Sequence, residues 1–181
     1  MTENYKIENC NAGFTLIEML VTVLVFSMLV IIITGIFAQA VRVERQAVLS
    51  QRIQENAMYV LESMAKEIRV SDIIDQDSPN CAAAPLDHIT INHPVNGVIT
   101  YRLNSSGNIE RQSSSTTIVN SSVTQFTRFN FCITGSGIND NQSAKVTTLI
   151  SIKNREGVGQ ISINLQTTVV SRNVVTEFQN P

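Results

Sequence analysis

The sequence predicts an α+β protein in which a long N-terminal helix packs, by its second half, on an antiparallel β-sheet. Three observations support this class. A charge-free apolar run lies near the N-terminus, an amphipathic helical pattern continues from it, and after about position 75 the pattern changes to the alternation of β-strands. A chain of 181 residues is expected to form one small globular domain beyond the helix.

The first predicted element is a membrane-spanning helix. The residues from Met19 to Val41 carry no charge, and at 1.5 Å per residue they make about 35 Å of helix, enough to cross a bilayer core of about 30 Å. Glu18 lies just inside this apolar run, where a carboxylate is costly without a partner. Cleavage after Gly13 would give Phe14 a positively charged amine, one helical turn from Glu18 or within reach of it on an adjacent subunit.

The segment from Gly13 to Glu18, Gly-Phe-Thr-Leu-Ile-Glu, resembles the signature of type IV prepilins. This signature is shared by type IV pilins, type II secretion pseudopilins and competence pseudopilins. The resemblance implies a cytoplasmic leader, residues 1–13, which prepilin peptidase removes between Gly13 and Phe14 before Phe14 is N-methylated. It also implies that Glu18 neutralises a neighbouring amine during assembly. The implied partners are that peptidase, other pilin or pseudopilin subunits, and an inner-membrane assembly platform with its ATPase.

Two features depart from the family pattern. The leader holds Lys6 against Glu3 and Glu8, whereas such leaders are usually basic. Basic residues follow the span: Arg42, Arg45 and Arg52. Counting cations therefore favours the opposite orientation. The motif takes precedence, which predicts a single-pass protein of the inner membrane with its C-terminal domain outside the cytoplasm, later part of a filament. The alternative is an ordinary signal anchor, with Glu18 reaching the headgroups, that carries a binding module.

The second part of the predicted helix is amphipathic. Its apolar stripe consists of Ala47, Ile53, Ala57, Val60, Leu61, Met64 and Ile68. The opposite face is charged, and Glu62 and Lys66 stand at the favourable spacing of four. One continuous helix is therefore expected from Phe14 to about Ile74, with a transmembrane half at 14–41 and an amphipathic half at 42–74.

The remaining residues, 75–181, predict a β-rich globular domain. The expected strands are 88–92, 98–103, 108–112, 123–133, 145–153 and 160–171. Asn96-Gly97, Ser106-Gly107 and Glu156-Gly157 are turn signals between them. The ending Thr167 to Asn173 resembles minor pilins of the PilW type and J-type pseudopilins, which favours a minor subunit.

Three cysteines bear on the compartment. Cys10 would leave with the leader, so Cys81 and Cys132 would remain on the oxidising side of the membrane. A disulfide between them would close a loop of about 50 residues and stabilise the fold by about 4 kcal/mol. The alternative is a pair of buried thiols.

The sequence offers little for other functions. The net charge is −2 with no basic block, which does not favour nucleic-acid binding. His88 and His93 are the only histidines, so neither a catalytic triad nor a zinc site is supported, and the protein is expected not to be an enzyme. Asp75, Asp77 and Asp140 are weak calcium candidates. Solvated turns are the preferred interpretation, and no metal or other cofactor is expected.

Overall fold

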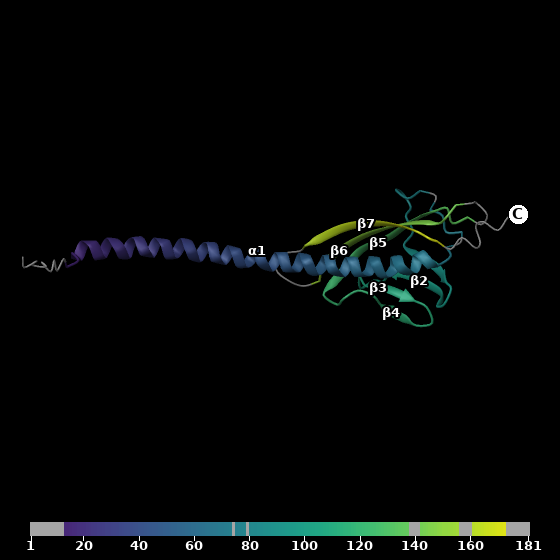
Figure 1. Ribbon diagram of the computed structural model, residues 1–181, viewed down its shortest axis with the longest axis horizontal. Coiled ribbons are helices and arrows are strands. Elements are labelled where there is room, and N and C mark those ends of the chain that lie inside the picture. Colours follow the sequence, from purple (N-terminus) through teal and green to yellow (C-terminus); the bar gives the residue numbers. More distant parts are fainter. Residues whose placement is uncertain (1–12, 74, 79, 138–141, 156–160, 173–181) are drawn as a thin grey trace, which may run out of the picture. The chain divides into compact units, whose positions relative to one another are not determined.

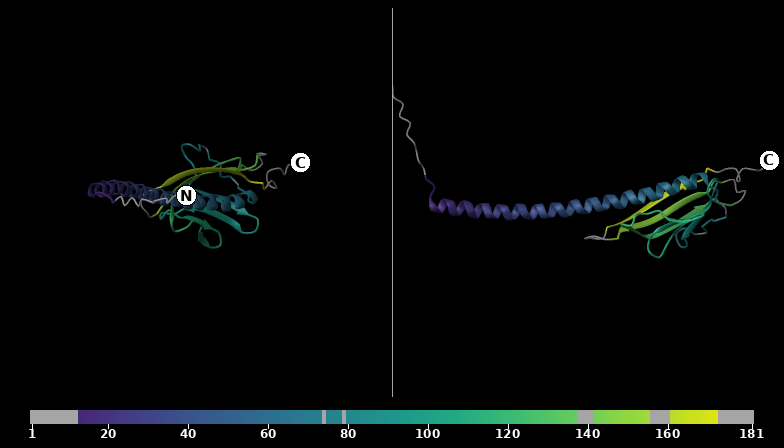
Figure 2. Two further views of the ribbon diagram at one scale, coloured as in Figure 1. Left: turned by 60° about the vertical axis from the view of Figure 1, so that its left-hand side comes forward. Right: turned by 90° about the horizontal axis from the view of Figure 1, so that it is seen from below.

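A computed structural model describes residues 13–73, 75–78, 80–137, 142–155 and 161–172. The chain divides into two compact units, residues 1–45 and 46–181, and helix α1 (Leu16–Val70) contributes to both. The first unit is the apolar half of α1. The second unit contains the rest of α1 and all the strands, and Figures 1 and 2 show this part of the helix lying along one face of the strands.

Both ends of α1 differ slightly from the expected bounds of Phe14 and Ile74. The helix begins at Leu16 because Thr15 precedes it as the capping residue. It ends at Val70 because the Ser71 main-chain N–H donates to the carbonyl of Ile68 and the Ser71 hydroxyl to that of Glu67. Beyond this point Asp72 pairs with Asn92, so the chain has already joined the β-structure.

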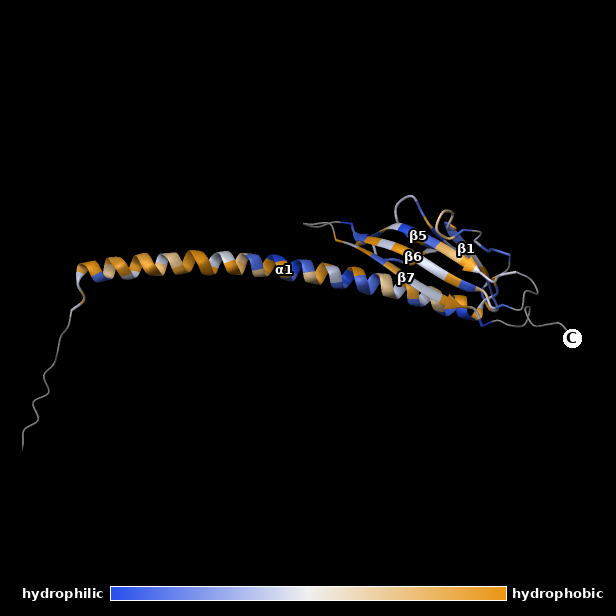
Figure 3. Cartoon of the chain, turned by 90° about the horizontal axis from the view of Figure 1, so that it is seen from above, coloured by the Kyte–Doolittle hydropathy of each residue, from blue (hydrophilic) through white to orange (hydrophobic). Residues whose placement is uncertain are grey.

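The hydropathy of α1 changes along its length, as Figure 3 shows. The first half is apolar on all sides, whereas the second half alternates between apolar and polar residues. The buried helical residues are Ile53, Ala57, Val60, Leu61, Met64 and Ile68, which confirms the predicted stripe except at its first member. Ala47 is exposed, and burial of the helix in the second unit starts only at Ile53.

The strands form two antiparallel sheets instead of the single sheet expected. The first has the order β1 (His88–His93), β2 (Gly97–Leu103), β3 (Ile109–Gln112) and β4 (Thr116–Ile118). The second has the order β5 (Thr124–Thr134), β6 (Lys145–Asn154) and β7 (Ser162–Val170). An isolated bridge between Leu86 and Phe131 links the segment before β1 to β5, so the two sheets share one layer against the helix.

The core lies between the helix and the inner faces of both sheets. Alternation along the strands is clear in β6, where every second residue from Val146 to Asn154 is buried. The first sheet contributes Ile89, Ile91, Ile99, Tyr101 and Ile109 to the core. The second contributes Phe126, Phe129, Phe131, Ile133, Val146, Ile150, Ile152 and Val169. One helical stripe and two apolar strand faces thus form a two-layer domain.

Replacement of Gly107, in the turn before β3, would be opposed by the fold on two grounds. Its φ of +75° favours glycine, and an added Cβ would lie 2.9 Å from the carbonyl oxygen of Phe126. The carbonyl of Gly107 accepts a hydrogen bond from the Phe126 N–H, so this turn joins the first sheet to the start of β5.

Candidate functional site: the processing and assembly segment

The predicted cleavage site lies outside the helix. Gly13, Phe14 and Thr15 are not helical, and Phe14 is 75% exposed. A peptidase needs an accessible main chain at the bond it cleaves, and the bond between Gly13 and Phe14 meets that condition in the described structure.

Thr15 and Glu18 set the start of α1. The Glu18 N–H donates to the hydroxyl of Thr15 at 3.3 Å and to its carbonyl at 3.1 Å. Threonine at the capping position with glutamate three residues later is the capping-box spacing, which satisfies main-chain donors that the first turn leaves free. A glutamate near a helix N-terminus is also favoured by the helix dipole. The position of Glu18 in the first turn is therefore electrostatically favourable for the helix, in addition to the role that the family resemblance implies.

Gly13 has no structural reason to be glycine among the described residues. A Cβ added there would meet no atom within 4 Å, and its φ is not in the left-handed region. Gly35, in the middle of the apolar half, is equally open. Neither glycine is demanded by contacts within the described residues.

The apolar half of α1 is suited to a non-aqueous environment. It is long and apolar enough to cross a membrane, and none of its most apolar window is buried within the chain. Three hydroxyls lie on it, those of Thr22, Ser27 and Thr34, and each donates to a main-chain carbonyl three or four residues earlier. These donors are therefore satisfied without water.

A second polar cluster joins α1 to the first sheet. The Glu67 carboxylate accepts a hydrogen bond from the Tyr101 hydroxyl at 2.5 Å and from two nitrogens of Arg111, at 2.9 Å from one of its terminal nitrogens. Burial, and then the hydrogen bond to Glu67, raises the pKa of Tyr101, and the hydrogen bonds from Arg111 to Glu67 raise the pKa of Arg111. Tyr101 is 1% exposed, so this cluster fixes the helix on β2 and β3 rather than facing a ligand.

The two remaining cysteines meet in the structure. Cys81 and Cys132 are joined as a disulfide, with Cα atoms 5.2 Å apart and a sequence separation of 51. The bond ties the segment before β1 to β5 of the second sheet, next to the bridge between Leu86 and Phe131.

Two of the three calcium candidates form hydrogen bonds with Ser136, Asp77 through its carboxylate and Asp75 through its main chain. The Asp77 carboxylate accepts from the main-chain N–H and the hydroxyl of Ser136, at 2.8 and 2.7 Å. The Asp75 N–H donates to the carbonyl of the same serine. Asp140 lies outside the described residues. Over the described part of the chain, no group of three acidic, histidine or cysteine side chains is placed to hold a metal ion.

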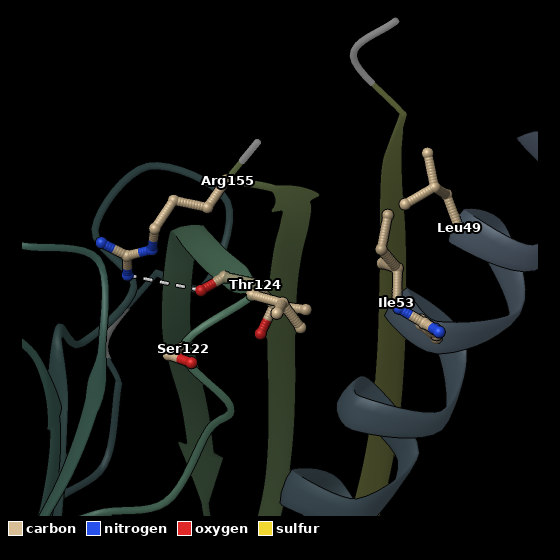
Figure 4. A pocket seen from close by; sticks show the side chains of 7 residues that line it. Leu49, Ile53, Ser122, Thr124 and Arg155 are labelled. Atoms are coloured by element: carbon tan, nitrogen blue, oxygen red, sulfur yellow. Dashed lines mark hydrogen bonds between the residues drawn. The ribbon is translucent and has the colours of Figure 1, made fainter. Parts of the chain in front are cut away.

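A cavity of about 380 Å³ lies in the second unit between α1 and the start of β5. Its lining residues are Leu49, Arg52, Ile53, Ser122, Val123, Thr124 and Arg155. Figure 4 shows the Arg155 guanidinium donating to the Thr124 carbonyl. It also donates to the Asn108 side chain at 2.8 Å, so this cation stabilises the loops around the cavity. None of the residues predicted for processing or assembly lines the cavity.

Comparison with known families gives a match at the N-terminus. Residues 9–34 match the model described as "Prokaryotic N-terminal methylation motif". This motif stands at the N-terminus of type IV pilins and pseudopilins, which are substrates of prepilin peptidase, and here it overlaps a helix that is long and apolar enough to cross a membrane. Proteins of this class are structural subunits and not enzymes. The match leaves the β-rich domain unassigned, and comparisons with curated proteins and with solved structures found no match for the chain.

Several of these contacts were not predicted from the sequence. The capping role of Thr15 could have been predicted from its spacing to Glu18. The Glu67 cluster was not, because its members are 34 and 44 residues apart in sequence. The same holds for Asn56 on α1, whose side-chain oxygen accepts from the Ser121 N–H and the Thr124 hydroxyl.

Proposed function

We propose that this protein is a minor pilin or pseudopilin subunit. It is cleaved between Gly13 and Phe14, N-methylated on Phe14, and held in the inner membrane with its β-rich domain outside the cytoplasm. An assembly platform and its ATPase then move it into a type IV pilus or a type II secretion pseudopilus. The observation that carries the proposal is the methylation motif at residues 9–34, which overlaps the start of an unburied apolar helix.

The open surroundings of Gly13 support cleavage at this position. Glycine is usually retained where the main chain needs a left-handed conformation or a close approach, and neither applies at Gly13 within the chain. A glycine that its own fold does not require is explained by an external partner that needs space at the bond, and a peptidase active site is such a partner.

The position of Glu18 supports a role in assembly. Its charge lies at the edge of the apolar run, where a carboxylate that cannot reach an opposite charge is costly. The amine freed at Phe14 would be the matching positive charge. Pairing between the amine of one subunit and Glu18 of a neighbour would then compensate both charges when the helices leave the lipid and pack together.

The apolar surface of the first half of α1 must be shielded from water both in the membrane and in a filament. None of its most apolar window is buried by the chain, so either lipid or other helices must cover it. Extraction from the membrane therefore requires an equivalent apolar surface in the filament. The sequence from Thr167 to Asn173, which resembles minor pilins of the PilW type and J-type pseudopilins, favours a minor role in that filament.

Glu18→Ala tests the assembly step in cells with a working pilus or pseudopilus machine. We expect the variant to be cleaved and held in the membrane as well as wild type, yet to be absent from sheared filaments. Glu44→Ala is the matched control, because Glu44 is an exposed carboxylate on the same helix beyond the apolar run. Incorporation of both variants at the wild-type level would contradict the proposal.

A further inference from the structure

A basic pocket lies where α1 ends. This cavity of about 560 Å³ is lined by Lys66, Arg69, Val70, Pro94 and Arg172. Three of its five lining residues are cations and none is a carboxylate. Its apolar part comes from Val70, which is 48% exposed, and from Pro94 in the turn after β1.

Main-chain contacts hold the cations together. Lys66 and Arg69 are three residues apart on α1, so they lie on the same face of the helix. The N–H of Arg172 donates to the carbonyl of Arg69 at 2.9 Å, and the Ser171 hydroxyl donates to the carbonyl of Ser71 at 2.7 Å. The end of β7 therefore places a third cation beside the last turn of the helix.

The fold does not need these charges to terminate α1. Cations often stabilise a helix end by contacting its free carbonyls. Here the carbonyls of Glu67 and Ile68 accept from Ser71, and that of Arg69 accepts from the Arg172 main chain. Three of the last four carbonyls are thus satisfied without a charged side chain.

The two arginines of the basic pocket lack a compensating carboxylate over the described ranges of the chain. Lys66 pairs with Glu62 at 3.1 Å, but both side chains are about two-thirds exposed, so this pair is weak. No ion pair involves Arg69 or Arg172 among the described residues. The pocket therefore carries a local excess of positive charge, and its like charges repel one another.

We propose that the basic pocket is a docking site for an acidic segment of another pilin-type subunit. Carboxylates of that segment bind the two guanidinium groups, and an apolar side chain of the segment packs on Val70 and Pro94. The pocket is shallow and its cations are exposed, so one small anion would gain little, whereas a protein segment makes several contacts at once. This inference rests on the proposed function, since it requires a filament in which subunits meet.

Reversing the three charges tests the proposal in the full-length protein. In K66E/R69E/R172E we expect normal cleavage and membrane level but incorporation into filaments lowered on the order of tenfold, because each attraction becomes a repulsion. The matched control is R52E/R128E/K145E, which changes the net charge equally at exposed positions elsewhere. Equal incorporation of the two triple variants would overturn the proposal, whether both are normal or both are impaired.

A charge-neutral variant and a crosslinking measurement control for misfolding of the charge-reversed variant. K66Q/R69Q/R172Q removes the charges without reversing them, and we expect a smaller loss of incorporation in the same direction. A photo-reactive residue at Val70 should crosslink to another subunit in wild-type filaments and lose that crosslink in the charge-reversed variant. The crosslinking of a photo-reactive residue at Ile118 on β4 should be the same in both proteins. A Val70 crosslink that persists in the reversed variant would also overturn the proposal. If wild-type protein never enters filaments, the proposed function itself fails.

Discussion

We predict that the hydrogen-bonded cluster of Glu67, Tyr101 and Arg111 contributes strongly to holding α1 on the first sheet. Replacing Glu67 with glutamine keeps the size of the side chain but removes the charge that faces Arg111. Breaking a buried ion pair costs about 3–5 kcal/mol, whereas breaking an exposed one costs about 0.2–1 kcal/mol. The Arg111 and Glu67 side chains are 20% and 22% exposed. We therefore expect E67Q to lower the free energy of unfolding by about 2 kcal/mol.

The measurement is denaturant and thermal unfolding of the full chain in detergent micelles, followed by near-ultraviolet circular dichroism. A loss of about 2 kcal/mol corresponds to a fall in Tm of roughly 6–10 °C for a domain of this size. Glu62→Gln is the control, because it breaks the exposed pair with Lys66 on the same helix and should cost less than about 0.5 kcal/mol. If E67Q were no less stable than E62Q, the cluster would not anchor the helix as argued.

Three further predictions concern the second unit. Replacing Cys81 and Cys132 with serine should lower the free energy of unfolding by about 4 kcal/mol, since the bond closes a long loop; thermal unfolding with and without reductant checks this. Burial raises the pKa of Tyr101 above its usual 10.0. The stability that its protonated hydroxyl contributes is therefore present below pH 10 and lost as the pH rises through the raised pKa. In Y101F the free energy of unfolding should fall less steeply with pH above pH 10 than in wild type. Burial also raises the pKa of Asp72, so the stability that its protonated form contributes is present below pH 3.8 and lost as the pH rises through the raised pKa. At neutral pH, D72N should therefore be at least as stable as wild type, and a clear loss of Tm would contradict this.

The helix and most strands could be predicted because their signals are local. The three-and-four spacing from Ile53 to Ile68 fixes which face of α1 is buried, and alternation fixes the inward residues of β6. By contrast, β4 is a three-residue strand with every residue exposed, so no apolar alternation marks it. The division into two sheets depends on which strands pair, and that is set by contacts far apart in sequence.

The processing segment was also predictable, since its signal is six consecutive residues before an apolar run. The basic pocket was not, because Arg172 reaches Arg69 only after β7 has crossed the domain. Its members lie about 100 residues apart and share no spacing rule. Local patterns therefore predict the anchor of this protein, whereas its docking surface depends on tertiary structure.

The mass of the mature N-terminus tests the central claim most directly. Protein purified from membranes of cells with an active prepilin peptidase should begin at N-methylated Phe14 and lack residues 1–13. A Gly13→Ala variant should accumulate uncleaved, because we propose that the peptidase needs the space that glycine leaves at this bond. The added methyl group itself meets no described atom of the chain. An intact Met1 in the wild-type protein would contradict the account and would indicate a signal-anchored binding module.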